Sequence, residues 1–202
     1  MNPAEGCTRC RLGTLTVPCP KRTSAGHPCD RCQGTGRRQH RRSVVWGQGA
    51  VPCDIMLIGE APGHYEDLEA APFRPHAPAG RVLARAVATS LQAHRLYITN
   101  VVKCRPPDNR LKDYPDAIVA CQDWLMLEIA AVQPKVIVTL GATAGQFVFP
   151  GKKAGEMAQL ARAMDSVLVV GAYHPSYVAR GTDPTAWGSL VQSFKRASEL
   201  VR

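Results

Sequence analysis

The sequence predicts an α/β domain of three layers, in which helices cover both faces of a central, mainly parallel sheet of four strands. Short apolar runs alternate along the chain with segments whose apolar residues recur at helical spacing. This alternation is typical of parallel sheets, because the connections between parallel strands are usually helices. Hydrophobic residues make up 45% of the 202 residues, which excludes a disordered or fibrous protein.

Four apolar runs predict the strands of this sheet. Each is short and rich in Ile, Val or Leu, as in a strand that is buried on both faces. They span residues 54–59, 96–102, 135–140 and 167–170.

Helices are expected between and after these strands. They cover about residues 80–94, 115–131, 142–149 and 184–201. Pro115 suits the first turn of its helix, and Asp183 followed by Pro184 is typical of an N-cap and the first helical residue.

The first 42 residues differ from the rest, and we expect a basic, Cys-rich, metal-binding segment at 1–42 before a domain at 43–202. This segment holds nine of the 25 Lys and Arg residues, two of the 16 acidic residues and five of the eight Cys. Concentrated positive charge favours a polyanionic partner such as nucleic acid. The alternative on charge alone is a solubilising, partly disordered tail.

Targeting signals are not evident in the sequence. No apolar run approaches the ~20 residues that a bilayer crossing needs, so we expect no membrane association. The first residues lack the pattern of a signal peptide, so we expect a cytoplasmic, nucleoid-associated protein. In such a reducing compartment, the cysteines are expected to be metal ligands rather than disulfides.

Three polar segments follow the predicted strands. They are GEAPG at 59–63, the segment 99–107 and YHPSY at 173–177. Ligands of open parallel sheets bind at the carboxyl ends of the strands. Each segment alone is weak evidence, but together they predict an active site with a carboxylate, an amide and an imidazole.

These segments carry a family resemblance. GEAPG at 59–63, NVVKCRPP at 100–107 and HPS at 174–176 occur in this order, together with CTRC at 7–10 and AGRVL at 79–83. The chain resembles the iron–sulfur branch, or family 4, of the uracil-DNA glycosylase superfamily. The resemblance implies an enzyme that extrudes uracil from single- or double-stranded DNA and hydrolyses its N-glycosidic bond, acting as a monomer.

The resemblance also implies roles in catalysis. Asn100 would hold the uracil N3–H and O4, His174 would donate to O2, and Glu60 would position the attacking water. On residue type alone, Asn100 could cap a turn and His174 could be a buried structural imidazole. The best-known branch of the superfamily has an Asp where this chain has Ala61.

Further residues are implied to contact the base. Phe73 would stack on uracil and Glu66 would exclude the thymine methyl, with Ala61 and Ser176 completing the substrate-binding set. On composition alone, Phe73 would be a core residue. Glu66 could equally be a solvated loop acid.

DNA contacts are implied on two segments. Residues 175–180 would enter the minor groove, with Tyr177 as a wedge and Arg180 on a phosphate. Lys103 and Arg105 would meet phosphates beside the pocket.

The cysteines divide into two sets. By resemblance, four ligate a [4Fe–4S] cluster: Cys7, Cys10, Cys104 and Cys121. An apparent insertion at 14–42 contains three more, Cys19, Cys29 and Cys32, which could bind Zn²⁺ with one of His27, His40 or Cys53. Two rival pairings remain open: a zinc ribbon formed by Cys7, Cys10, Cys29 and Cys32, or Cys29 and Cys32 as the cluster pair.

A second departure from the family is the segment 72–83, which is two residues longer and carries His76. The longer segment could reshape the pocket rim. The alternatives to a uracil glycosylase are therefore a divergent, non-catalytic DNA-binding module or a glycosylase for another deaminated base.

Overall fold

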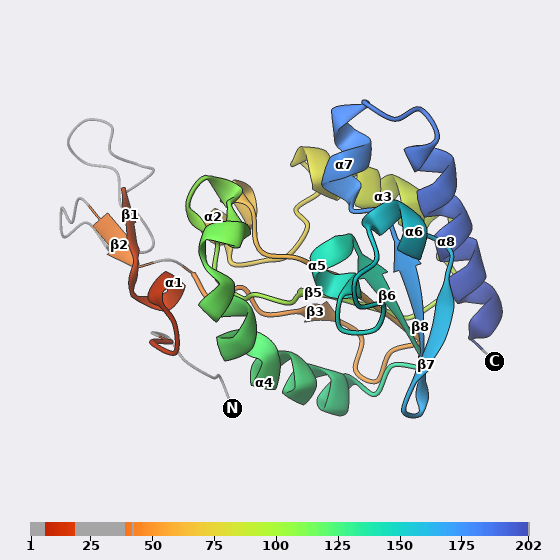
Figure 1. Ribbon diagram of the computed structural model, residues 1–202, viewed down its shortest axis with the longest axis horizontal. Coiled ribbons are helices and arrows are strands. Elements are labelled where there is room, and N and C mark those ends of the chain that lie inside the picture. Colours follow the sequence, from red (N-terminus) through yellow and green to blue (C-terminus); the bar gives the residue numbers. More distant parts are fainter. Residues whose placement is uncertain (1–6, 19–38, 42, 202) are drawn as a thin grey trace.

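A computed structural model describes residues 7–18, 39–41 and 43–201 (Figure 1). Its centre is a six-stranded sheet with the strand order β3-β5-β4-β6-β8-β7. The strands are β3 (Gln48–Gly49), β4 (Ile55–Gly59), β5 (Leu96–Asn100), β6 (Val136–Leu140), β7 (Ala161–Met164) and β8 (Val167–Ala172). A separate two-stranded sheet pairs β1 (Thr16–Pro18) with β2 (Gln39–Arg41).

The sheet is larger than the four strands expected. The four predicted strands are the inner ones, β5, β4, β6 and β8, and they are parallel to one another. The two additional strands, β3 and β7, are antiparallel at the edges. β3 has two residues and β7 is mostly exposed, so neither has the apolar run of a buried strand.

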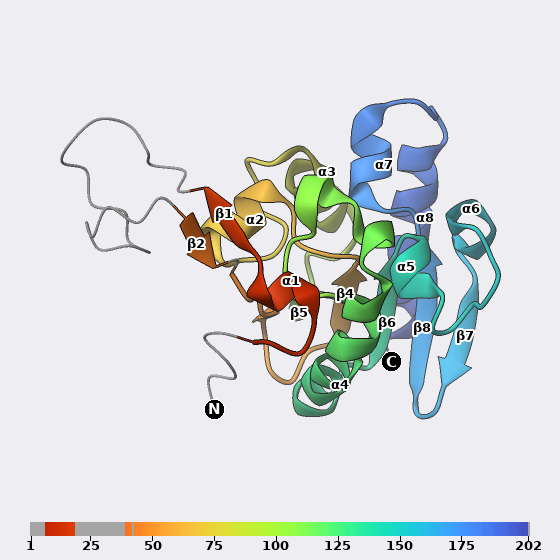
Figure 2. The same ribbon diagram turned by 60° about the vertical axis from the view of Figure 1, so that its left-hand side comes forward.

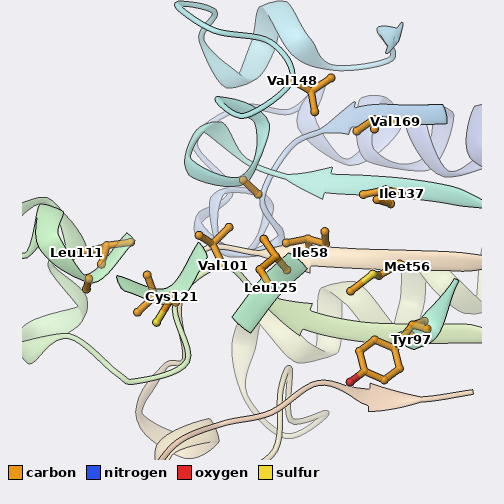
Figure 3. Packing of buried hydrophobic residues seen from close by; sticks show 14 of the residues in the cluster. Met56, Ile58, Tyr97, Val101, Leu111, Cys121, Leu125, Ile137, Val148 and Val169 are labelled. Carbon is orange, nitrogen blue, oxygen red and sulfur yellow. The ribbon is translucent and has the colours of Figure 1, made fainter. Parts of the chain in front are cut away.

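Helices cover both faces of the sheet, which confirms the three-layer prediction. Residues of β4 alternate between two cores, with Leu57 beside α3 (Pro78–Ser90) and α8 (Ala186–Leu200). Ile58 faces the other core with α4 (Pro115–Val132) and α5 (Ala142–Gly145), as Figure 3 shows in part. The last helix, α8, begins at Ala186, two residues after Pro184, which the sequence predicts as its first helical residue.

The shorter helices lie around the carboxyl edge of the sheet and in the N-terminal segment. They are α1 (Arg11–Thr14), α2 (His64–Glu69), α6 (Ala154–Met157) and α7 (Pro175–Arg180), with the 3-10 turns η1 (Pro107–Asn109) and η2 (Leu111–Asp113). None of the described helices is long and apolar enough to cross a membrane.

Helix α1 packs against α4, as Figure 2 shows from the side. The Leu12 side chain is fully buried in the core beside α4. Arg9 pairs with Asp123 at 3.4 Å. The Arg11 backbone N–H donates to Asp116 at 3.4 Å. Part of the positive charge of this segment is therefore matched by acids of α4.

The register of the parallel strands aligns their carboxyl ends. Gly59 of β4 is the partner of Asn100 of β5, and Leu140 of β6 is the partner of Ala172 of β8. The three polar segments predicted to meet at one edge therefore do so.

Candidate active site

A cavity of about 940 Å³ opens at the carboxyl edge of the sheet. Its walls come from the loop after β4, α2, the starts of α3 and α5, α6, and the segment from Tyr173 to α7. Seven residues predicted from the sequence line it: Glu60, Ala61, Glu66, His174, Ser176, Tyr177 and Arg180. Figure 1 shows α2 and α7 well apart, and the cavity has residues of both in its walls.

Asn100 and Phe73 lie together beside Gly59, next to residues that line the cavity. A Cβ on Gly59 would stand 2.4 Å from Asn100 Oδ1 and 2.7 Å from Phe73 Cζ, so both side chains approach the bare backbone of Gly59. Asn100 is 1% exposed, and its Oδ1 and Nδ2 have no hydrogen-bond partner among the described residues. Each such atom costs about 1–3 kcal/mol, so this amide is poised for a ligand.

His174 caps α7 and is held in one tautomer. Its Nδ1 accepts from the Ser176 backbone N–H at 3.1 Å and lies 2.8 Å from Ser176 Oγ. Because Nδ1 accepts, we assign the proton of the neutral ring to Nε2. Burial, with help from the positive charge of Arg180, lowers the pKa of His174 to about 4. The imidazole is therefore a neutral donor at pH 7.

Glu66 connects two backbone segments of the site. Its carboxylate accepts from the N–H groups of Gly63 and Phe73, both at 2.7 Å. Burial raises its pKa, and these two backbone donors oppose the rise. The Asn100 amide also opposes it slightly, although its geometry falls short of a hydrogen bond. Phe73 has φ +48°, a strained value for a bulky residue, and Glu66 holds it there.

Glu60 is half-buried, and its carboxylate accepts from Thr143 Oγ1 at 2.5 Å. Thr143 lies on α5, after β6. Thr143 was not predicted from the sequence. Its position shortly after β6 could have indicated that it lies near the site.

Lys103 was predicted to contact a phosphate, and this is wrong in the structure. It is 1% exposed, and its ammonium donates to Thr99 Oγ1 at 2.8 Å, to the Asn100 carbonyl at 2.6 Å and to Glu128. Burial lowers the pKa of Lys103, and the Glu128 carboxylate opposes the fall. A side chain enclosed in this way cannot reach DNA.

Glu128 on α4 was also missed by sequence reasoning. Besides Lys103, it accepts from Gly47 N–H and Thr99 Oγ1, both at 2.8 Å, and from the Tyr97 hydroxyl at 3.2 Å. A lone acid within the apolar stretch of α4 could have indicated a buried partner.

The other predicted DNA contacts lie around the mouth of the cavity. Tyr177 stacks on Tyr173, with ring centroids 5.1 Å apart and an interplanar angle of 8°. The Arg180 guanidinium lies 5.4 Å from the Tyr177 ring. Across the mouth, Arg105 donates to Asn109 Oδ1 at 3.0 Å.

Four cysteines from two distant parts of the chain lie near one another. Cys104 and Cys121 are buried, and Cys7 and Cys10 are half-buried free thiols. Burial raises the pKa of Cys104 to about 12, with added contributions from the Cys121, Cys10 and Cys7 thiols. Burial also raises the pKa of Cys121. The hydrogen bond from the Lys103 backbone opposes this rise, and Cys10 and Cys7 add to it.

Four thiols from two parts of the chain are the donor set that a four-iron cluster uses. Among the described residues, no three His, Cys, Asp or Glu side chains are close enough to hold one metal ion. A four-iron cluster binds each thiolate to a different iron, so its ligands stand farther apart. Gly13 allows the loop to form, since a Cβ there would lie 2.0 Å from the Cys7 carbonyl oxygen.

The expected zinc ligands cannot be placed in the same way. Cys19, Cys29, Cys32 and His27 lie outside the described residues, as does the side chain of His40. Cys53 is buried, which raises its pKa to about 11, with a further contribution from Asp54. The zinc site stays a prediction.

Comparisons with known proteins agree with this geometry. The family model of the uracil DNA glycosylase superfamily matches residues 46–195. The type-4 uracil-DNA glycosylase of Archaeoglobus fulgidus is 35% identical over 179 residues, which cover 84% of this chain and 87% of that protein. That of Thermotoga maritima is 32% identical, covering 85% and 90%. The type-5 uracil-DNA glycosylase of Pyrobaculum aerophilum is 33% identical, covering 80% of each chain.

Proposed function

The chain belongs to the uracil-DNA glycosylase superfamily, and from this premise we propose that the cavity between α2 and α7 binds an extruded uracil. Its similarity to type-4 members over most of its length makes it a DNA repair glycosylase that excises uracil. The expected alternative of a non-catalytic module is not supported. The unpartnered, buried amide of Asn100 is the observation that best supports the placement of the substrate.

Asn100 reads the edge of the base. Uracil presents N3–H as a donor beside O4 as an acceptor, and an amide offers the complementary pair. Cytosine presents the reverse pattern, an acceptor at N3 and a donor at N4. The amide N–H of Asn100 would then face a donor, and its oxygen would face an acceptor. Each mismatch costs about 1–3 kcal/mol, which discriminates against the normal base.

His174 stabilises the leaving group. As the glycosidic bond breaks, negative charge develops on uracil O2, and a donor already in place lowers the barrier. The Nε2–H assigned above is such a donor, and Ser176 fixes the ring that carries it. Phe73, whose ring centroid lies 5.8 Å from that of His174, covers the face of the base.

Glu60 acts on the sugar side. Its carboxylate lines the cavity and is oriented by Thr143, so it can position a water or offset the cationic charge of the sugar. Ala61 lines the same wall. Glu66 sets the depth of the pocket near the base and excludes the thymine methyl.

The DNA backbone crosses the cavity mouth. Tyr177 fills the gap left by the extruded nucleotide, while Arg180 and Arg105 contact phosphates on either side. We propose that the protein acts as a monomer, on single- or double-stranded DNA.

Type-4 relatives are the iron–sulfur branch of the superfamily, and we propose that Cys7, Cys10, Cys104 and Cys121 hold a [4Fe–4S] cluster here. When bound, the cluster supplies a covalent link between the N-terminal segment and the loop that follows β5. The chain's own residues perform the hydrolysis. Iron analysis and visible absorption of the purified protein test this assignment.

The activity is tested with uracil-containing oligonucleotides, single- and double-stranded, followed by alkaline cleavage of abasic sites. The cluster-loaded protein is expected to produce cleavage at uracil and none at cytosine or thymine. Asn100→Ala should lower the rate strongly, whereas Val119→Ala, at an exposed position on α4, should not. Absence of product from the loaded wild-type protein would sink the proposal.

A further inference from the structure

Three aromatic rings lie in contact on the α2 side of the cavity. The centroid of the Tyr65 ring is 5.3 Å from that of His64, with an interplanar angle of 70°. It is 4.9 Å from that of His76, at 85°. His76 belongs to the segment that is longer than in the family pattern. Edge-to-face contacts on two sides fix the orientation of Tyr65.

Tyr65 is not a core residue. It is 45% exposed and belongs to neither of the two core clusters. Tyr65 and His64 both line the cavity, so an exposed ring stands at the edge of the proposed uracil site. A large aromatic in such a position can contact a ligand without displacing any of the core.

A positive group lies beside the rings. The Arg105 guanidinium is 3.3 Å from His64 Nδ1, and no acidic side chain pairs with it in the described part of the chain. By contrast, Arg74 and His76 both contact Glu69. Arg105 is therefore a cation on this rim whose charge no acid matches among the described residues.

This combination matches a single nucleotide. Exposed aromatic rings stack on nucleobases, and nearby Arg side chains bind the phosphates between them. The opposite rim has the same composition, with Tyr177 stacked on Tyr173 beside Arg180. When one nucleotide is extruded, its two neighbours stay at the mouth, one towards each rim.

We propose that Tyr65, braced by His64 and His76, is a stacking site for the nucleobase next to the extruded uracil, with Arg105 on the adjoining phosphate. The inference rests on the proposed uracil-excising function. Bases in a duplex are already stacked and paired, so this contact stabilises complexes with single strands more than with duplexes. We therefore expect Tyr65→Ala to weaken binding of single-stranded oligonucleotides more than binding of duplexes.

The test is a double-mutant cycle between Tyr65 and the neighbouring base. Single-stranded oligonucleotides carry 2′-fluoro-2′-deoxyuridine, which resists cleavage, and Kd is measured by fluorescence anisotropy with cluster-loaded protein. In two further oligonucleotides, a base-free spacer replaces the nucleotide on the 5′ or the 3′ side. Tyr65→Ala should weaken binding of the complete oligonucleotide by about 5- to 150-fold, the range that alanine substitution of a stacking aromatic gives.

With one of the two spacer oligonucleotides, the wild type and Tyr65→Ala should have the same Kd, because the Tyr65 ring then has no base to contact. Tyr65→Phe should bind like the wild type, and so should Phe147→Ala, an exposed aromatic that is 43% accessible and lines a different cavity. Equal losses with all three oligonucleotides, or no loss, would overturn the inference. A wild-type protein that releases no uracil from ordinary substrates would instead contradict the proposed function.

Discussion

The buried Lys103–Glu128 pair should be worth several kcal/mol to the fold. Glu128 is 9% exposed and accepts from four donors, one of them the ammonium of Lys103. Glu128→Leu would leave that ammonium buried without a counter-charge. Breaking a buried pair by removing one partner costs about 3–5 kcal/mol. For a chain of this size that corresponds to a melting temperature lower by about 6–20 °C.

The double variant Lys103→Met/Glu128→Leu separates charge from packing. It leaves no unpaired charge, although the Gly47 N–H, the Thr99 hydroxyl and the Tyr97 hydroxyl lose their acceptor, at about 1–3 kcal/mol for each group that stays unpaired. The same three groups lose that acceptor in Glu128→Leu, which also leaves a buried charge. It should therefore melt above Glu128→Leu alone. Replacing a whole buried pair by apolar residues is far less costly than breaking it.

The assay is thermal unfolding of the cluster-loaded protein at one scan rate, followed by tryptophan fluorescence. Trp46 and Trp124 are in edge-to-face contact, with centroids 5.4 Å apart, and both lie close in sequence to residues of this network. Arg196→Ala is the control, since Arg196 pairs with Glu199 at 3.6 Å on the surface and such pairs contribute up to about 1 kcal/mol. A Glu128→Leu loss no larger than that of the control, or strict additivity in the double variant, would refute the reasoning.

Three other expectations concern the site. Because His174 has a pKa of about 4 in the fold, the unfolded chain binds more protons between that value and about pH 6.5, so stability should fall as pH drops through this window. The melting temperature, measured against pH, should depend less on pH in His174→Gln than in the wild type. An unchanged pH dependence would mean that other groups cause it. Cys104→Ser should lose iron, whereas Cys53→Ser should retain it, as iron-to-protein ratios will report; equal iron contents would contradict the ligand set. Gly59→Ala introduces a Cβ 2.4 Å from Asn100 Oδ1 and should reduce excision at least ~100-fold with a smaller effect on melting temperature. Wild-type rates in that variant would refute the packing argument.

Much of the fold could be predicted because its inner strands are buried on both faces. Such strands are continuous apolar runs, and β4, β5, β6 and β8 were found in this way. The edge strands β3 and β7 have exposed residues and no run to recognise. Pairing with a neighbour, rather than their own composition, places them in the sheet.

The strand-end motifs lie at one edge of the sheet, as their order along the chain predicts, whereas the predicted exposure of Lys103 is wrong. A lysine after a strand has the same sequence signal whether it points to solvent or inward. Its direction is decided by Glu128, an acid 25 positions away on α4 that is opposite it only in the folded chain. Contacts of that kind depend on tertiary packing, which a motif does not encode.

The docking of Leu12 on α4 also has a consequence for biosynthesis. Leu12 is made before α4, and its buried position beside that helix exists only after about a hundred more residues have been added. At ~5–20 residues per second, that interval lasts roughly 5–20 s. During it, the neighbouring Cys7 and Cys10 thiols have no partner from the domain. With the proposed ligand set, the four thiols can be complete only after Cys121 of α4 has left the ribosome.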